Sequence, residues 1–153
     1  MAQAIISRKG GGYATITFNN AKGNSITKTT TSPLSSAKQD LSATTVGGYA
    51  LFGGGYVGGE LATVDAYNSS LTRSTPTALS EARRILAATT VGDYALFGGG
   101  YVNSYPYARP TVDAYNTSLT RSTPTALSEA KYGLAAATVG NYALFAGGHV
   151  NEY

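Results

Sequence analysis

The chain contains no cysteine, no tryptophan and a single methionine, and only 12% of its 153 residues are charged. The lack of cysteine excludes a disulfide framework, a thiolate nucleophile and a thiolate metal site. The low charge, together with abundant glycine, threonine, alanine and tyrosine, argues against a coiled coil, a long exposed helix or a charge-rich disordered tail. The length is that of one ordinary domain.

Basic residues slightly outnumber acidic ones, with a formal net charge of +3, and no basic run is longer than two residues. We therefore expect no nucleic-acid partner. No segment reaches the ~18 consecutive apolar residues of a membrane helix, and the apolar run before Ser7 is too short for a secretion signal. We expect no membrane contact, and a virion-associated or an intracellular location both stay open.

The chain repeats itself. The sequence Val-Gly-Gly-Tyr-Ala-Leu-Phe-Gly-Gly-Gly returns in nearly the same form, with spacings of 91 − 46 = 45 and 139 − 91 = 48 residues. Its copies occupy residues 46–55, 91–100 and 139–148. A second motif at residues 70–82 recurs unchanged at 118–130, and a degenerate version occupies 25–37. A fixed period of this length indicates an array of similar structural units.

Each repeat is expected to form four short strands, termed strands a to d in chain order. In the best-defined copy, residues 87–91 and 94–97 flank the turn dipeptide Gly92-Asp93, which predicts a tight hairpin of strands a and b. Residues 111–115 alternate in polarity as a strand c does, and residues 119–122 follow as strand d. The connector to the next strand a contains a proline, so we expect it to be extended, with at most one helical turn.

Four-stranded units at a period of about 40–50 residues are typical of β-propeller blades. The glycines that close strand b, a tyrosine near the end of strand c, and a basic residue before the next strand a (Arg83, Lys131) resemble the kelch repeat. The resemblance covers nearly the whole chain from about Tyr13 onward. It departs from the family in lacking the tryptophan that usually follows in strand d, where this chain has Leu71-Thr-Arg73. The resemblance implies an all-β, kelch-like β-propeller.

The strand count gives the expected organisation of the chain. Residues 1–12 are an N-terminal segment, 13–30 strands c and d of a shared blade, 42–75 and 87–123 two full blades, and 135–148 strands a and b of a shared blade. These are three four-stranded blade equivalents, whereas propellers close with about four to eight blades. We therefore expect a homodimer that forms a six-bladed ring, each chain completing a blade of the other. The near-identical copies also suit an engineered or excised fragment of a longer repeat protein.

The loops between strands b and c carry most of the variation between repeats, and the longer of the two is rich in tyrosine. Exposed tyrosine and arginine are typical of surfaces that bind sugars or proteins, because the rings offer contact area at low entropy cost. The candidate ligand-binding residues are Tyr56, Tyr101, Tyr105, Tyr107, Arg109 and His149. We expect Tyr105, Tyr107 and Arg109 to be exposed to solvent. The alternative is that these rings only cover the edges of the blades.

Charged residues recur inside the expected strands. Asp65 and Asp113 lie in strand c, while Arg73 and Arg121 lie in strand d. Buried charges need partners, and an acid that recurs in every full blade predicts a structural ion pair rather than an active site. The single histidine, His149, has no clustered carboxylate, so we expect no metal site, no cofactor and no Ser-His-Asp arrangement.

These patterns favour a non-enzymatic structural or binding module that presents a tyrosine-rich loop face to a glycan or protein ligand. The low charge and near-identical repeats are similar to kelch-like repeats of bacterial and bacteriophage proteins, and that resemblance implies a surface, tail or adhesion role. Two alternatives stay open. One is a scaffold without a ligand, and the other is a sugar-processing enzyme, for which the sequence lacks a catalytic constellation.

Overall fold

The computed structural model describes residues 2–7, 13–18 and 26–151, and within them it contains strands, turns and loops but no helix. This confirms the all-β prediction. The connectors at residues 79–82 and 127–130, where one helical turn was allowed, contain none. Accordingly, no helix in the described ranges is long and apolar enough to cross a membrane.

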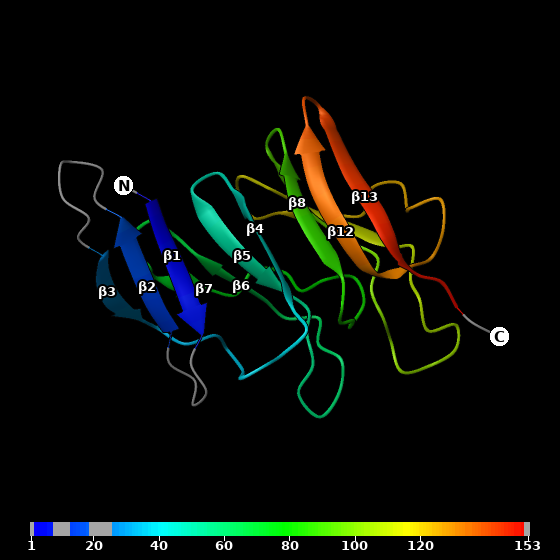
Figure 1. Ribbon diagram of the computed structural model, residues 1–153, viewed down its shortest axis with the longest axis horizontal. Coiled ribbons are helices and arrows are strands. Elements are labelled where there is room, and N and C mark those ends of the chain that lie inside the picture. The colour runs from blue at the N-terminus through cyan, green and yellow to red at the C-terminus, as the bar shows by residue number, and fades with distance from the viewer. Residues whose placement is uncertain (1, 8–12, 19–25, 152–153) are drawn as a thin grey trace.

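The described strands form four antiparallel sheets that follow one another along the chain (Figure 1). The N-terminal sheet consists of β1 (Ala2–Ser7), β2 (Tyr13–Phe18) and β3 (Ile26–Thr31). The first complete sheet contains β4 (Ser42–Val46), β5 (Tyr49–Gly53), β6 (Val64–Tyr67) and β7 (Arg73–Ser74). The second complete sheet contains β8 (Ala87–Val91), β9 (Tyr94–Gly98), β10 (Val112–Asn116) and β11 (Arg121–Ser122). The C-terminal sheet contains only β12 (Tyr132–Val139) and β13 (Tyr142–His149).

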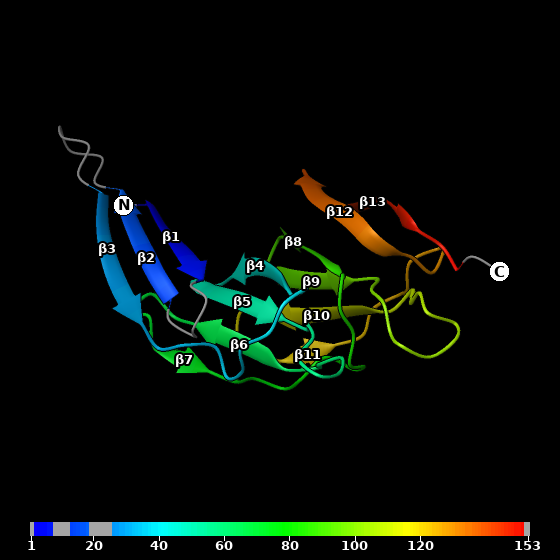
Figure 2. The ribbon, with the colours of Figure 1, turned by 60° about the horizontal axis from the view of Figure 1, so that its bottom comes forward.

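The sheets lie side by side in an open array, with the N-terminal and C-terminal sheets at opposite ends (Figures 1 and 2). The first strands of successive repeats are neighbours, because β8 contacts both β4 and β12. Threonine hydroxyls join them: Thr44 Oγ1 lies 2.7 Å from Thr90 Oγ1, and Thr89 Oγ1 lies 2.8 Å from Thr138 Oγ1. The same contact thus recurs at the same repeat position in both junctions.

The main hydrophobic core lies between the two complete sheets. Leu51, Phe97 and Tyr115 are fully buried there, and the rings of Phe97 and Tyr115 meet edge to face with centroids 5.9 Å apart. Burying a large apolar side chain contributes roughly 1.5–3 kcal/mol. The packing of one sheet on the next therefore supplies most of the apolar stabilisation.

The glycines after strand b let the following linker approach closely. Gly54 has a φ of +70°, and a Cβ at this position would lie 2.6 Å from the Arg83 carbonyl oxygen. Gly99, its counterpart one repeat later, has a φ of +68° and would place a Cβ 2.6 Å from the Lys131 carbonyl oxygen. Only glycine satisfies both the left-handed backbone and the lack of space.

The N-terminal sheet differs from the strand count made on the sequence. Residues 1–12 were assigned to a segment outside the blade strands, but Ala2–Ser7 pairs with β2 from Ala2↔Phe18 to Ser7↔Tyr13. In each chain, β1 therefore occupies the edge of β2, the expected strand c, at which strand b of a partner chain was expected. Pairing of two chains in that form requires β1 to leave β2.

Candidate functional site

One residue pair recurs where each linker meets the end of strand b. The three linkers are residues 32–41, 77–86 and 125–134, and each places one residue opposite the position that follows the glycines. The resulting pairs are Gln39↔Tyr56, Arg84↔Tyr101 and Tyr132↔His149. In the second pair both backbone bonds are made, since the amide of Arg84 donates to Tyr101 and the amide of Tyr101 donates to Arg84, at 3.0 and 2.7 Å.

The side chains of these pairs stack on one another across the repeats. The Arg84 guanidinium lies between two rings, 4.7 Å from the centroid of Tyr56 and 4.9 Å from that of Tyr101. Tyr101 meets Tyr132 edge to face at 5.2 Å, and Tyr132 stacks on His149 at 5.3 Å. We call Tyr56, Arg84, Tyr101, Tyr132 and His149 the aromatic row. It crosses three successive repeats without a break.

The longer b–c loop adds two tyrosines to the aromatic row. Tyr107 stacks on Tyr101 with a centroid distance of 5.7 Å and an interplanar angle of 5°, and Tyr105 meets Tyr107 edge to face at 5.8 Å. Tyr105 is 61% exposed and Tyr107 37%. The loop therefore presents ring surface to solvent beside the row.

Arg109 is placed differently from the expectation. Its side chain is only 18% exposed, because Nε donates to Glu81 Oε1 at 2.6 Å and the guanidinium also donates to the Pro106 carbonyl. The expectation that Arg109 is solvent-exposed is wrong. This arginine holds the base of the tyrosine loop against the linker that carries Glu81.

The charge around the aromatic row is compensated by carboxylates. Arg84 lies 3.1 Å from Asp40 Oδ2 and 3.5 Å from Glu60 Oε1. His149 is exposed and has the ring of Tyr132 as its neighbour. No group of three or more histidines, cysteines or carboxylates that suits a metal ion occurs among the described residues. The row thus offers ring faces, one guanidinium and carboxylate oxygens.

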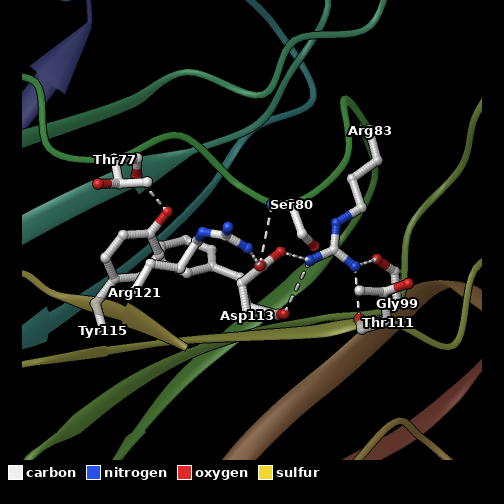
Figure 3. A network of polar contacts seen from close by, with 9 residues as sticks. Thr77, Ser80, Arg83, Gly99, Thr111, Asp113, Tyr115 and Arg121 are labelled. Carbon is white, nitrogen blue, oxygen red and sulfur yellow. Dashed lines mark hydrogen bonds and ion pairs between the residues drawn. The ribbon is translucent and has the colours of Figure 1, made fainter. Parts of the chain in front are cut away.

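A second constellation lies around Asp113, which is fully buried (Figure 3). Arg83 and Arg121 approach its carboxylate from opposite sides, at 2.5 and 2.9 Å, and the backbone amide of Ser80 donates to it at 3.0 Å. Arg83 also donates to three backbone carbonyls, those of Gly99, Thr111 and Phe97. This saturation by the protein's own groups leaves Asp113 no free oxygen for chemistry.

The preceding repeat builds the same site around Asp65. Ser35 donates to it through both its amide and its hydroxyl at 3.0 Å, and Lys38 Nζ lies 3.3 Å away. Arg73, the partner that strand d supplies, is more distant at 3.8 Å. In both repeats the closest cation comes from the linker. Lys131, at the same linker position in the last repeat, pairs instead with Glu129 at 3.0 Å on the surface.

Burial perturbs the ionisable groups of these two sites. It lowers the pKa of Arg83, and the negative charge of Asp113 opposes that shift. It also lowers the pKa of Lys38, with Asp65 opposing it in the same way. Burial raises the pKa of the Tyr115 hydroxyl, and the nearby charge of Asp113 adds to the rise. These directions are those of structural groups that have been desolvated and paired.

Sequence reasoning named Tyr56, Tyr101 and His149 but missed Arg84 and Tyr132. Both stand directly after the basic linker residue, at the repeat position that holds Gln39 in the first linker. This position differs in every copy, as does the one after it, although a basic residue precedes it and a leucine follows two residues later each time. Variation within near-identical repeats was the signal that would have found it.

No protein-family model and no curated protein matches the chain. Among solved structures, the chain is similar to that of YjhT, with a TM-score of 0.70 and 12% sequence identity. The match covers 92% of this chain, which spans 45% of the length of that protein. At this identity the likeness shows the fold alone.

Proposed function

We propose that the chain is a non-enzymatic binding module, built from the blades of a kelch-like β-propeller, whose aromatic row and tyrosine loop bind a carbohydrate. The observation that carries the proposal is the unbroken stack from Tyr56 to His149, flanked by the exposed rings of Tyr105 and Tyr107. The blade assignment is supported by the recurring sheet junctions and by the likeness to the solved structure of YjhT.

The chemistry of the row suits a sugar. The flat faces of tyrosine rings pack against the apolar C–H faces of pyranoses, and their hydroxyls hydrogen-bond at the rim. Stacking on neighbouring rings fixes each side chain before the ligand arrives, which lowers the entropy cost of binding. The carboxylate of Asp40, 33% exposed beside Arg84, adds an acceptor for sugar hydroxyls. A polymer of several sugar units fits a row that extends across three repeats.

An enzyme is disfavoured by the way in which the acids are used. Asp65 and Asp113 are fully buried and bound by their own linkers, so neither faces a substrate. In the described ranges, the carboxylates near the row, those of Asp40, Glu60 and Glu81, pair with arginines but are less buried. The described carboxylates near the row thus serve as partners of arginines, which disfavours their use as acid and base on a glycosidic bond.

The test is a glycan array followed by calorimetric titration of the best glycan. The double variant Tyr105→Ala and Tyr107→Ala should weaken that glycan at least tenfold and leave the thermal midpoint unchanged, because both rings lie outside the core. Tyr142→Ala removes a ring that is 72% exposed on the C-terminal sheet and is the matched control, with unchanged affinity. An array without any binder would favour the scaffold without a ligand.

The homodimeric six-bladed ring stays a prediction of the strand count, and in that form it requires β1 to leave β2. The carbohydrate proposal does not depend on it, because every residue of the aromatic row comes from one chain. Light scattering tests it directly, since a dimer has a mass of 2 × 15.7 = 31.4 kDa.

A further inference from the structure

An apolar cavity of about 530 Å³ lies between the second complete sheet and the C-terminal sheet. Six of its apolar lining residues come from both sheets and from the linker between them. They are Leu96, Val112, Ala114, Leu127, Ala143 and Phe145. Such a cavity forfeits the contacts that a filled core would make.

The same six positions one repeat earlier surround a tyrosine. Their counterparts are Leu51, Val64, Ala66, Leu79, Ala95 and Phe97, and all belong to the buried cluster that contains Tyr115. There, the Tyr115 ring packs against Phe97, and its hydroxyl donates to the Thr77 carbonyl at 2.7 Å. In the cavity, the corresponding carbonyl belongs to Thr125, which is also part of the lining. The cavity therefore has the lining of a tyrosine site that is filled in the preceding repeat.

A smaller hollow of about 240 Å³ lies beside it and repeats the site of Asp113. Its lining includes Ser128, Lys131 and Gly147, the counterparts of Ser80, Arg83 and Gly99. The Arg83 side chain is fully buried against Asp113, whereas that of Lys131 is 29% exposed and lies 3.0 Å from Glu129, a residue of the same lining that is 60% exposed. Among the described residues, the hollow thus has no counterpart of Asp113, and Lys131 contacts the carboxylate of Glu129 instead.

The residues that fill both sites in the preceding repeat belong to one strand. Asp113 and Tyr115 lie two residues apart on β10, as Asp65 and Tyr67 do on β6, and each of these strands pairs with the strand b that precedes it. The strand b of the last repeat is β13, and within the described part of the chain it pairs with β12 alone. Leu144 on β13 is 52% exposed, while its counterpart Leu51 is fully buried.

We propose that the free edge of β13 binds, in antiparallel register, an extended segment of another polypeptide that carries the sequence Val-Asp-Ala-Tyr. The carboxylate of the segment occupies the hollow at Ser128 and Lys131, and its tyrosine ring fills the larger cavity with the hydroxyl on the Thr125 carbonyl. Backbone hydrogen bonds give affinity, and the two side-chain sites give specificity. This inference does not rest on the carbohydrate proposal.

A second copy of this chain fits the site less well through its N-terminal sheet. Arg73 on β7 lies opposite Tyr67, and by the repeat offset its counterpart on β3 is Lys28, which lies opposite Ile16. The position of Asp65, two residues before Tyr67, then falls to Ala14, which has no carboxylate for Lys131. The proposed occupant is therefore a segment with the aspartate and not β2 of a second copy.

The experiment titrates the full-length protein with a synthetic peptide of residues 110–122. The wild-type peptide should bind and should slow amide exchange in residues 142–149, with no effect on the paired strand 94–98. The same peptide with Asp113→Asn, or with Tyr115→Ala, should bind at least tenfold more weakly. Equal affinity of all three peptides, or no binding, would overturn the proposal.

Protein variants separate the carboxylate site from the edge itself. Lys131→Met should weaken binding of the wild-type peptide about tenfold and leave binding of the Asp113→Asn peptide unchanged, since that peptide has no carboxylate to pair with Lys131. Glu129→Ala, which releases Lys131 from its present partner, should bind the wild-type peptide at least as well. A protein with a mass of 2 × 15.7 = 31.4 kDa in solution that binds the peptide only after the dimer dissociates would contradict the proposal. The edge would then belong to the interface with a second copy.

Discussion

The substitution Asp113→Asn tests whether the buried ion pairs hold the repeats together. Asp113 and the side chain of Arg83 are both fully buried, and their charged atoms lie 2.5 Å apart. Asparagine keeps the size of the side chain but removes the charge, so the Arg83 guanidinium remains buried without its counterion. Removing one partner of a buried pair costs about 3–5 kcal/mol. We expect a loss of that size in the free energy of unfolding.

Two further variants show whether the loss comes from the stranded charge. Adding Arg83→Met to Asp113→Asn removes the unpaired cation and should recover part of the stability, because an apolar side chain tolerates this site better than an unpaired charge does. Glu129→Ala breaks the exposed pair with Lys131 and should cost no more than about 1 kcal/mol. It is the matched control for loss of an ion pair.

Urea unfolding followed by circular dichroism measures all four proteins. The midpoint should fall in Asp113→Asn, rise again in the double variant and stay nearly unchanged in Glu129→Ala. A cost below about 1 kcal/mol for Asp113→Asn would show that water reaches Arg83. The description of these sites as desolvated would then be wrong.

Three other predictions follow from single sites. The raised pKa of Tyr115 keeps its hydroxyl protonated in the folded chain above pH 10, where the same hydroxyl ionises in the unfolded chain. The free energy of unfolding should therefore fall with rising pH by up to about 1.4 kcal/mol per pH unit. Urea titrations at several pH values should show that Tyr115→Phe removes this dependence. Gly54→Ala should lower the free energy of unfolding by about 1–3 kcal/mol more than Gly58→Ala, since both glycines have positive φ but only Gly54 has no room for a Cβ. Equal unfolding midpoints of the two variants would contradict this. Arg84→Ala should lower the free energy of unfolding by about 1–2 kcal/mol through two ring contacts of roughly 0.5–1 kcal/mol each, and a thermal midpoint identical to the parent's would count against the stacked arrangement.

Much of the fold was predictable because the period of the repeats can be read directly from their near-identical copies. The turn at Gly92-Asp93 sits in a tight β8–β9 hairpin, with Val91 opposite Tyr94. The strand at Ala2–Ser7 was missed, since the N-terminal residues lack the shared motif and only their pairing with β2 defines them. Repetition predicts an element only where the copies still resemble one another.

The buried charges show a similar limit. Recurrence of Asp65 and Asp113 indicated a structural role, and the arginines of strand d were the nearest candidates in sequence. The structure brings the linker cations Lys38 and Arg83 closer, from the connection that precedes the sheet. Arg83 is farther from Asp113 in the sequence than Arg121 is. The closer cation is therefore found only from the way in which the linker crosses the next sheet.

In near-identical repeats, positions that stay the same can be compared with positions that differ between copies. Residues that hold one sheet on the next, such as Asp65 and Asp113, are the same in each complete copy, because each junction poses the same packing problem. The row position differs in every copy, with Gln39, Arg84 and Tyr132, although the backbone there pairs in the same way each time. A shared packing constraint favours one residue at all three places, as at Leu41, Leu86 and Leu134 two positions later. The variation therefore favours a surface on which the side chains meet something other than the chain's own core, and the row is where a ligand is best sought.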